Sequence, residues 1–523
     1  MTMEELTPVF AGWNAAGGAV RPGEFQYQIA PAQLPELARL LAGKASLLGM
    51  LALDERAVDG NYRILQLFGL EGGQVLTVSA PVPEDQPVFP SVTPFLPAAH
   101  WYEREIGDLF GVRPIGHPDP RRLVIHRGWP KGSHPLRKDY QPATAVKASG
   151  YEGNFSYQQV KGNGVHQVPV GPIHAGIIEP GHFRFHVVGE SVLELDARLF
   201  YTHRGIEKLA EGRAWPELLP LAERLCGVCT VSHSFSLALA LERLTGIAPP
   251  RRASYLRVVL AELERVYNHL NDISAICAGV GLALGTQRAA EFKEAALELN
   301  RALTGHRYLR GAVIPGGVRQ DLDPAQLTMV EVFLEQLEGD LAGLWEAVSG
   351  SDVFLDRMQR TGVLTLENAL ALGAVGPAAR ASGVRADTRV DQPYAAYPQL
   401  QLEVPVETDG DVYSRFAIRF AEIRGSLSLI RQALADLPEG PVAVELPALL
   451  PPGAQAFGIT ESARGSNLHW LKTDSGGRIF RYAVRSASFP NWPALATAVP
   501  GNIIPDFPLI NKSFELCYAC LDR

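Results

Sequence analysis

Four of the five cysteines in this chain of 523 residues stand in two Cys-x-x-Cys pairs. Cys226 and Cys229 form the first pair, and Cys517 and Cys520 form the second. Two residues between cysteines allow both sulfurs of a pair to reach one metal ion from a single turn of backbone. Four thiolates are a soft ligand set, which suits zinc, iron–sulfur clusters, nickel or copper(I). The cysteines therefore predict metal chemistry.

The two pairs lie 288 positions apart, counted from Cys229 to Cys517. Zinc ribbons and related structural sites close their second pair within a few tens of residues, because the metal organises a small local fold. The pairs can meet here only if one large domain brings its middle and its last residues together. We therefore expect a site buried in a core. The alternatives are a structural tetrathiolate zinc site and disulfide pairing.

Composition and charge narrow the class of protein. A net charge of −8 and a pI of about 5.9 give no indication of nucleic-acid binding. Apolar residues make up 46% of the chain, enough for a large core, and the length predicts about two to four domains. Few cysteines, mostly paired, are typical of metal sites in a reducing compartment. We find no signal peptide and no apolar run of about 18 residues, so we expect a chain that is soluble by itself.

Residues 1–140 have the pattern of a small α+β module. An amphipathic pattern predicts a short helix, and apolar runs between turn signals such as Asp59-Gly60 and Gly72-Gly73 predict strands. The helix is expected over Leu34–Leu41, and the strands over Leu47–Leu53, Tyr62–Phe68 and Gln74–Val78. Residues 141–165 are polar and glycine-rich, which favours a linker.

Three apolar stripes at helical spacing predict long helices in the middle of the chain. The stripes span residues 256–270, 330–345 and 416–430. We expect long antiparallel helices to form the rigid frame that brings the cysteine pairs together. On the first of them, Glu262, Glu264 and His269 are interpreted as solvated or ion-paired. Cys277 has no partner in the sequence and is interpreted as a small buried hydrophobe.

The sequence around the cysteines resembles the large, catalytic subunit of the [NiFe] hydrogenases. Residues 224–229 match the first motif of that family, Arg-x-Cys-Gly-x-Cys, and His233 follows four positions later. The second motif is a Cys-x-x-Cys pair near the C-terminus. The resemblance implies a Ni-Fe(CN)2(CO) centre at the cysteines and His233. It makes Cys226 and Cys517 terminal nickel ligands, and Cys229 and Cys520 bridges between nickel and iron.

The resemblance also assigns a proton-transfer role to Glu179, which stands 47 positions before Cys226. A carboxylate buried beside thiolates has its pKa raised by desolvation and by like charge, so it can pass protons near neutral pH. The alternative is a solvated loop glutamate. His174 and His182, from the same segment, are interpreted as hydrogen-bonded structural residues.

Arg464 and Gly465, followed by His469 and Trp470, match a further motif, although Ala463 stands where the family usually has proline. The resemblance implies that this arginine lies over the open nickel–iron position. A guanidinium there is fixed, always protonated, and close to the place where H2 is polarised. The alternative is a structural arginine in an ion pair.

The end of the chain adds a second expectation. Glu207 occupies a position at which many members of the family bind magnesium together with a C-terminal histidine. This chain has Arg523 at its end, which cannot ligate a metal, so we expect Glu207 to pair with a cation and leave magnesium open. Arg523 lies three positions past Cys520, where a nickel-dependent maturation protease removes an extension in the family. The protease and accessory proteins are therefore implied partners.

Residues 101–112 resemble the thirty-kilodalton subunit of respiratory complex I, and the chain from Val168 onward resembles its forty-nine-kilodalton subunit. We interpret the Glu-Arg-Glu run at 103–105 as salt-bridged positions on a docking face. The predicted fold class is α+β, with a small N-terminal α+β domain before a large, mainly α-helical domain. That larger domain would be of the type shared by the [NiFe]-hydrogenase large subunit and the forty-nine-kilodalton subunit. The predicted divisions are 1–140, a linker at 141–165, and 166–523.

The resemblance implies the catalytic subunit of a membrane-linked, complex-I-related [NiFe] hydrogenase of the formate hydrogenlyase type. No cysteines remain for an iron–sulfur cluster in this chain, so electrons would come from a small subunit with a [4Fe–4S] cluster. Ferredoxin-like and integral membrane subunits complete the implied complex, without nucleic acid. The chain would be cytoplasmic and peripheral on the inner membrane. The rivals are a quinone-reducing complex-I-like subunit, whose family lacks the four cysteines, and a non-enzymatic scaffold with structural zinc.

Overall fold

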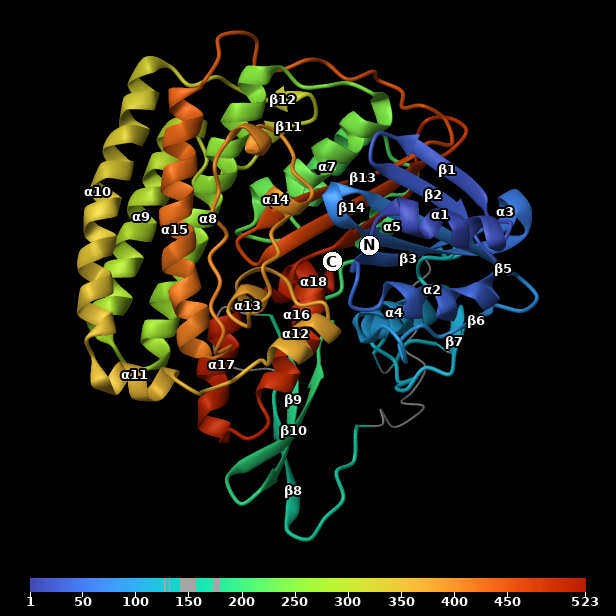
Figure 1. Ribbon diagram of the computed structural model, residues 1–523, viewed down its shortest axis with the longest axis horizontal. Helices are drawn as coiled ribbons and strands as arrows, with labels where there is room; N and C mark the ends of the chain where they lie inside the picture. Colours follow the sequence, from blue (N-terminus) through green and yellow to red (C-terminus); the bar gives the residue numbers. More distant parts are fainter. Residues whose placement is uncertain (127, 131, 142–156, 173–178) are drawn as a thin grey trace.

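The computed structural model describes residues 1–126, 128–130, 132–141, 157–172 and 179–523. Helices and strands are both abundant along the chain, which confirms the predicted mixed α+β fold. In Figure 1 the N-terminal sheet lies on one side and the long helices on the other, with the C-terminal end of the chain between them. Most of the predicted linker lies outside the described residues, so the domain boundaries stay predictions.

A five-stranded sheet with the order β1-β2-β5-β4-β3 forms the N-terminal part. β2 and β5 run parallel, and the other neighbours run antiparallel. The strands are β1 (Ala16–Arg21), β2 (Glu24–Gln28), β3 (Ser46–Glu55), β4 (Asn61–Gly69) and β5 (Val75–Pro83). The three predicted strands are thus confirmed as β3, β4 and β5.

The helix predicted over Leu34–Leu41 is confirmed as α2, and its apolar positions 34, 37, 38 and 41 are all buried. The sequence pattern did not reveal α1 (Met3–Gly12), which contains Pro8. Proline is disfavoured inside helices, because it lacks the N–H donor. The pattern also did not reveal β1, whose sequence is rich in glycine and alanine and whose side chains are largely exposed.

Helix α4 (His100–Phe110) carries the Glu-Arg-Glu run and corrects its interpretation. Glu103 is fully buried and accepts a hydrogen bond from Ser91 Oγ at 2.5 Å. Arg104 is also buried, and its Nη1 lies 3.1 Å from Asp119 Oδ2. The predicted ion pairing is therefore present. The prediction that these residues form a docking face is wrong, because Glu103 and Arg104 are buried and contact residues of their own chain.

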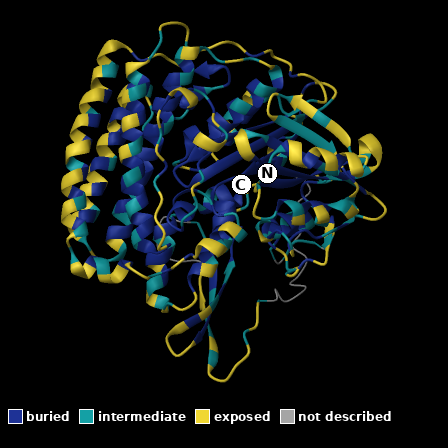
Figure 2. Cartoon of the chain, viewed as in Figure 1, coloured by how far each residue is buried: buried dark blue, intermediate teal, exposed yellow. Residues whose placement is uncertain are grey.

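Four long helices form the other side of the molecule: α8 (Arg251–Gly279), α9 (Ala283–Thr304), α10 (Pro324–Ser349) and α15 (Val412–Ala435). They contain the three predicted stripes, which are largely buried, so the predicted helices are confirmed. α8 packs on both α9 and α15 and is mostly buried, whereas α10 exposes much of its length (Figure 2). Cys277 on α8 is buried as predicted, and burial raises its pKa to about 12.

A three-stranded antiparallel sheet joins the two sides: β13 (Gln455–Ser462), β14 (Gly465–Thr473) and β15 (Ile479–Arg485). α7 (Thr230–Thr245) packs against β13 so closely that a Cβ added at Gly458 would lie 1.9 Å from Ser236 O. Only glycine permits this approach. Apolar side chains of β3, β4 and β5 share a cluster with this sheet, which includes Leu51, Leu53, Leu67, Val75, Ile459, Leu468 and Trp470.

A second three-stranded sheet extends from the body (Figure 1): β8 (Val165–Val170), β9 (His182–Val188) and β10 (Ser191–Arg198). The other strands are short: β6 (Val88–Pro90), β7 (Arg113–Ile115), β11 (Val313–Ile314) and β12 (Gly317–Val318). The other α-helices are α3 (Arg56–Asp59), α5 (Ile206–Ala210), α6 (Leu218–Glu223), α11 (Asp352–Met358), α12 (Leu366–Ala371), α13 (Gly376–Arg380), α14 (Thr388–Asp391), α16 (Ser488–Ala498), α17 (Phe507–Phe514) and α18 (Tyr518–Asp522).

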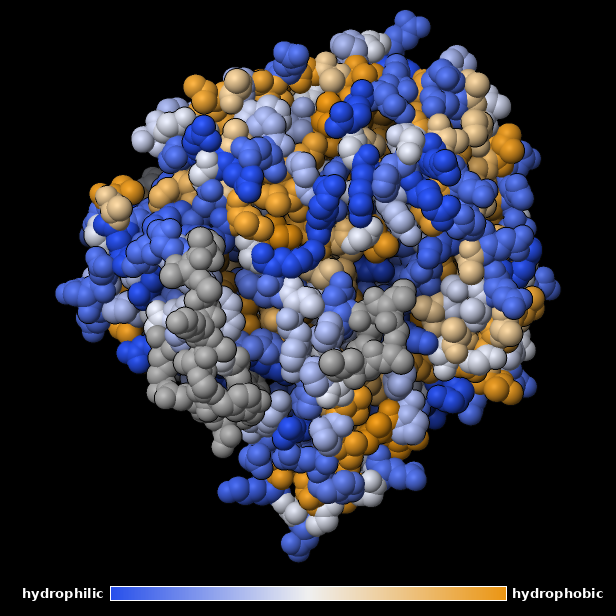
Figure 3. Space-filling model, turned by 180° about the vertical axis from the view of Figure 1, so that it is seen from behind, coloured by the Kyte–Doolittle hydropathy of each residue, from blue (hydrophilic) through white to orange (hydrophobic). Residues whose placement is uncertain are grey.

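The face opposite that of Figure 1 is mainly hydrophilic, with apolar residues in several separate patches (Figure 3). Among the described residues, we find no helix that combines the length and the apolar character needed to span a bilayer.

Candidate metal centre

The structure brings the two cysteine pairs together in one cluster. Cys226 Sγ lies 3.4 Å from Cys517 Sγ. Cys226, Cys229 and Cys520 are buried, and Cys517 is partly buried beside them. All four are free thiols. The structure therefore places sulfurs from the middle and from the end of the chain in one cluster.

Each pair stands at the start of a helix. Cys226 and Cys229 lie in the connection between α6 and α7, and Cys229 is the residue before α7. Cys517 directly precedes α18, and its Sγ accepts a hydrogen bond from the backbone N–H of Cys520 at 3.3 Å. The thiols of the two pairs are not equivalent, because the hydrogen bond with Cys226, together with burial, raises the pKa of Cys229 well above that of an ordinary thiol.

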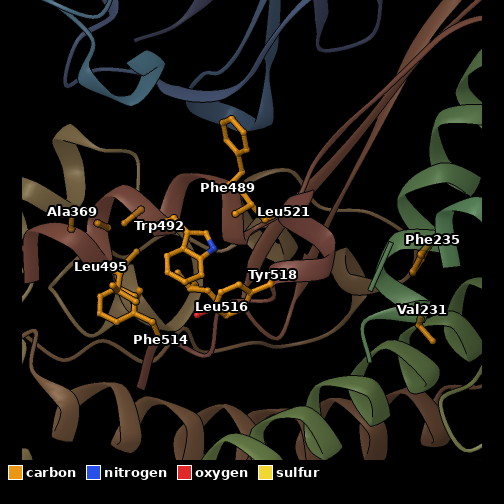
Figure 4. Close-up of a cluster of buried hydrophobic side chains, with 14 of the residues drawn as sticks. Val231, Phe235, Ala369, Phe489, Trp492, Leu495, Phe514, Leu516, Tyr518 and Leu521 are labelled. Carbon is orange, nitrogen blue, oxygen red and sulfur yellow. The ribbon is translucent and has the colours of Figure 1, made fainter. Parts of the chain in front are cut away.

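Apolar packing fixes the second pair. Figure 4 shows Trp492, Phe514, Leu516 and Tyr518 gathered around the C-terminal helices. The rings of Trp492 and Tyr518 lie 4.9 Å apart in an edge-to-face arrangement. All four side chains are buried, so the residues around Cys517 cannot shift without opening a close-packed core.

The donor set fits a thiolate-bound metal group. Two sulfurs that each bind one ion at about 2.3 Å can lie as far apart as Cys226 and Cys517 do. Hydrogen bonds from Cys229, Cys517 and Cys520 lower the pKa of Cys226 well below that of an ordinary thiol. In the described part of the chain, no three Cys, His, Asp or Glu side chains are already closed around an ion position. The fit therefore rests on donor chemistry and on the one sulfur–sulfur distance.

Arg464 lies beside the first cysteine pair. Its Nη1 is 3.8 Å from Cys229 Sγ and donates to Asn268 Oδ1 at 2.8 Å. Its Nη2 donates to Asp272 Oδ1 at 3.1 Å, and its Nε donates to the backbone oxygen of Glu515 at 2.7 Å. The structure thus combines both sequence-based interpretations, because Arg464 is ion-paired and also points a fixed positive charge at a cysteine.

Further buried charged side chains lie next to Arg464. Arg419 Nε donates to Asp272 Oδ2 at 3.0 Å. Burial by itself raises the pKa of Asp272, but Arg464, His269 and Arg419 together lower it well below its ordinary value, so the carboxylate stays ionised. Farther along α8, His269 Nε2 lies 2.8 Å from Glu422 Oε2, so His269 is paired rather than solvated. Alternating charges offset the cost of burying each one.

Two glutamates on α8, Glu262 and Glu264, have different hydrogen-bond partners. Glu262 pairs with Arg389 at 3.1 Å, which confirms the ion-paired interpretation. For Glu264 that interpretation was wrong. It is buried and accepts hydrogen bonds from the backbone N–H groups of Val231 at 2.6 Å and Ser232 at 2.9 Å. Burial raises the pKa of Glu264 to about 7. This carboxyl group therefore caps α7 and holds the segment that follows Cys229.

Glu179 lies partly buried near the second cysteine pair. Burial chiefly, and the charge of Glu179 in addition, raise the pKa values of Tyr518 and Asp522. A Cβ added at Gly181 would lie 2.9 Å from Tyr518 Cε1, so this segment packs directly on that ring. Tyr518 follows Cys517 in the chain, and Glu179 is therefore close to the predicted site.

The predicted histidines have different surroundings. His233 is buried, and its Nδ1 lies 3.0 Å from His469 Nε2. His182 Nδ1 lies 3.4 Å from the backbone oxygen of Gly171. This contact agrees with the structural role predicted for His182. His174 lies outside the described residues.

Glu207 forms the predicted ion pair with a cation. Its Oε1 lies 3.1 Å from Arg523 Nη1, and its Oε2 lies 2.8 Å from Arg481 Nη2. Arg523 Nη2 also donates to the carboxylate of Glu105 on α4. Alternating charges therefore link the N-terminal module to the last residue of the chain.

Replacement of Arg523 by methionine is expected to destabilise the protein by about 3–5 kcal/mol, because Glu105 and Glu207 would lose a buried cation. Denaturant unfolding of the full-length chain measures this effect. Arg213→Met is the matched control, since Arg213 pairs with Glu217 at the surface and should matter little. Equal, small losses for both variants would contradict a structural role for the Arg523 cluster.

Three families of known proteins match different parts of the chain. The model described as the respiratory-chain NADH dehydrogenase 30 Kd subunit matches residues 27–146, and that of the 49 Kd subunit matches residues 280–457 and 447–523. The model for nickel-dependent hydrogenase matches residues 204–273. Formate hydrogenlyase subunit 5 of Escherichia coli (strain K12) is 37% identical over 502 residues, which cover 94% of this chain and 87% of that protein. The chain belongs to the formate hydrogenlyase-type family of hydrogenase large subunits.

Two other relatives of this hydrogenase-family chain are a hydrogenase component and a complex-I-type subunit. Hydrogenase-4 component G of Escherichia coli (strain K12) is 35% identical over 482 residues, or 90% of this chain and 82% of that one. The C/D subunit of NADH-quinone oxidoreductase from Gluconacetobacter diazotrophicus is 29% identical over 554 residues, covering 95% and 91%. The protein is thus a hydrogenase-like or complex-I-like oxidoreductase subunit, in which regions similar to two separate complex I subunits are fused.

Sequence reasoning missed two α8 residues that hold Arg464 in this member of the hydrogenase family, and it misread a third α8 residue, Glu264. Asn268 and Asp272 hold its guanidinium, and Glu264 caps the neighbouring helix. A signal was present, because residues 264, 268 and 272 follow one another at a spacing of four on a largely apolar helix. Polar groups at that spacing share one helix face. No pattern in the sequence, however, pointed to Glu105 as a partner of Arg523.

Proposed function

We propose that the chain is the catalytic subunit of a membrane-associated [NiFe] hydrogenase, which interconverts protons, electrons and H2. The observation that carries this proposal is the buried cluster of four thiols, drawn from the middle and the end of the chain, with Arg464 beside it. When bound, the nickel–iron group supplies the redox chemistry for two electrons. Cys226, Cys229, Cys517 and Cys520 would hold that group.

The chain's own residues would handle charge and protons. Arg464 places a fixed positive charge at Cys229, which stabilises negative charge on that sulfur and on a substrate next to it. Asp272 and Asn268 hold the guanidinium in one orientation. A cysteine Sγ can accept a proton, and the carboxylate of Glu179 would carry it toward solvent. Magnesium is not required at Glu207, because arginines pair with both of its oxygens.

Only Cys277 lies outside the two cysteine pairs of this sequence, so the iron–sulfur cluster that delivers electrons would have to be in a partner subunit. A small subunit with a [4Fe–4S] cluster would supply electrons, together with ferredoxin-like and integral membrane subunits. A nickel-dependent protease and accessory proteins would mature the site. These partners would hold the chain at the cytoplasmic side of the inner membrane. The names of the relatives, formate hydrogenlyase and hydrogenase-4, support this proposal.

The rival function is quinone reduction, favoured by the similarity to the C/D subunit of NADH-quinone oxidoreductase. A quinone reductase would have no use for four convergent thiols, and neither would it need a guanidinium at a cysteine. Protein from a host able to mature nickel–iron sites is expected to evolve H2 from a reduced dye. Turnover with quinone but not with protons would overturn the proposal.

Replacement of Glu179 by glutamine is expected to lower H2 evolution by at least about 10²-fold, because the amide cannot carry a proton. The nickel content should stay unchanged, since Glu179 is not assigned as a ligand. Glu190→Gln is the matched control, an exposed glutamate in the turn between β9 and β10. Activity at the control level in Glu179→Gln would exclude this carboxylate from the proton path.

A further inference from the structure

Two histidines from different parts of the chain line one cavity. His126 follows the buried residues 123–125 of the N-terminal module, and His203 lies just before α5. Both rings are partly buried, and the cavity between their segments has a volume of about 100 Å³. The rest of its lining is aliphatic or aromatic, and includes Trp129 and Tyr201. The two imidazoles are therefore the groups in this cavity best able to bind a metal ion.

One nitrogen of each ring is hydrogen-bonded to a backbone carbonyl. His126 Nε2 lies 2.6 Å from the backbone oxygen of Leu199, and His203 Nδ1 contacts the backbone oxygen of Asp522. A carbonyl oxygen can only accept, so each of these two nitrogens must carry a proton and donate it. The backbone therefore fixes which nitrogen of each ring is the donor.

The second nitrogen of each ring keeps its lone pair. Burial lowers the pKa of His126 to about 4 and also lowers the pKa of His203, so both rings are neutral at pH 7. A neutral imidazole carries one N–H, which the carbonyl contacts already use. Among the described residues, His126 Nδ1 and His203 Nε2 have no hydrogen-bond partner. Both nitrogens are thus available to a ligand.

This arrangement is typical of histidines that bind a metal. Such a histidine usually donates its other ring N–H to a carbonyl or a carboxylate, which fixes the ring and makes the ligating nitrogen more basic. Both rings have that contact, and His203 is close enough to act electrostatically on the His126 ring. Neutral imidazole suits zinc, nickel and copper ions. The cavity is large enough for such an ion with water ligands.

Hydrogen bonds hold the two segments that carry the rings. Asp108 Oδ2 accepts from the backbone N–H of Ile125, the residue before the first histidine, at 3.1 Å. Asp522 Oδ2 accepts from the backbone N–H of Thr202, the residue before the second, at 2.9 Å. Ligands that are already held in place lose little conformational freedom when an ion binds. The segments therefore favour binding by both rings.

We propose that His126 and His203 form a second metal site, which binds a divalent transition-metal ion such as Zn²⁺ or Ni²⁺ through His126 Nδ1 and His203 Nε2. Among the described residues, no third histidine, cysteine or carboxylate closes around this pair, so water completes the coordination. The ion links the N-terminal module to the segment that binds the C-terminal end of α18. The site uses none of the four paired cysteines, so the proposal does not rest on the hydrogenase function.

Anomalous diffraction from crystals of the full-length chain soaked in zinc chloride locates the ion. We expect a peak at about 2.1 Å from both His126 Nδ1 and His203 Nε2. A cavity without a peak, or an ion bound by one histidine alone, would overturn the proposal. Zinc at the four cysteines would give a separate peak, which bears on the proposed function and not on this site.

His126→Gln removes one ligand and keeps a polar side chain. Over a series of zinc concentrations, the affinity of the cavity should fall by at least about tenfold, the smaller loss expected when only a partner of a ligand is removed. His166→Gln is the matched control, since His166 is an exposed histidine on β8, and it should keep the peak. An unchanged peak in His126→Gln would show that His126 is not a ligand.

Thermal unfolding gives a second readout in solution. An ion that binds only the folded chain raises its melting temperature. Part of the rise that zinc causes in the wild type should be lost in both His126→Gln and His203→Gln, and none of it in His166→Gln. The part that remains reports zinc bound elsewhere, such as at the cysteines. Equal rises in the wild type and in both cavity variants would contradict zinc binding by the two histidines.

Discussion

Replacement of Cys226 by serine is expected to remove nickel from the protein and to lower H2 evolution by at least about 10³-fold, or about 4 kcal/mol of barrier. Cys226 lies at the centre of the cluster, 3.4 Å from Cys517 Sγ, and the other three thiols donate to it. Serine is smaller and is a poor ligand for a soft metal. Metal analysis of purified protein and a dye-linked H2 assay measure the two effects.

Cys277→Ser is the matched control for this experiment. Cys277 is equally buried, but it lies on α8 away from the cluster, and burial raises its pKa to about 12. Its replacement should leave the nickel content unchanged. If Cys226→Ser retained nickel, or if both variants lost it to the same degree, the four cysteines would not be the ligand set.

Replacement of Arg464 by lysine is expected to lower the turnover rate by about 10²–10³-fold, or about 3–4 kcal/mol. Lysine keeps the charge, but it cannot contact Asn268, Asp272 and the Glu515 backbone at the same time, as the guanidinium does. The charge beside Cys229 would therefore no longer be fixed. The nickel content should remain close to that of the wild type, which separates this effect from loss of the site.

Arg257→Lys is the control for Arg464→Lys. Arg257 is also fully buried and binds a carboxylate with two nitrogens, on Glu242, but it lies near the beginning of α8 and contacts no cysteine among the described residues. It should lose stability without a specific loss of turnover per nickel. Equal turnover per nickel in the wild type and Arg464→Lys would restrict Arg464 to a structural role.

Sequence reasoning worked best where a local pattern sets the structure. The stripes of α8, α10 and α15 and the apolar runs of β3, β4 and β5 are periodic within short segments, and all six elements were predicted. The two cysteine pairs could be placed together because four soft ligands need one metal. The resemblance to a known family added the roles predicted for Glu179 and Arg464.

The rest depends on contacts between distant parts of the chain. Glu103 has the character of a surface charge until α4 packs against the segment after β6 and buries it beside Ser91. Glu105 meets Arg523 across 418 positions, which no local pattern can indicate. Buried polar residues are thus the class that the sequence alone places least well.

The most direct test of the hydrogenase assignment is metal analysis together with infrared absorption on the wild-type protein from a maturation-competent host. We predict about one nickel and about one iron per chain, bound by the four cysteines. We also predict absorption bands in the CO and cyanide stretching region. Zinc alone in such a preparation, without those bands, would contradict the hydrogenase assignment and favour the scaffold.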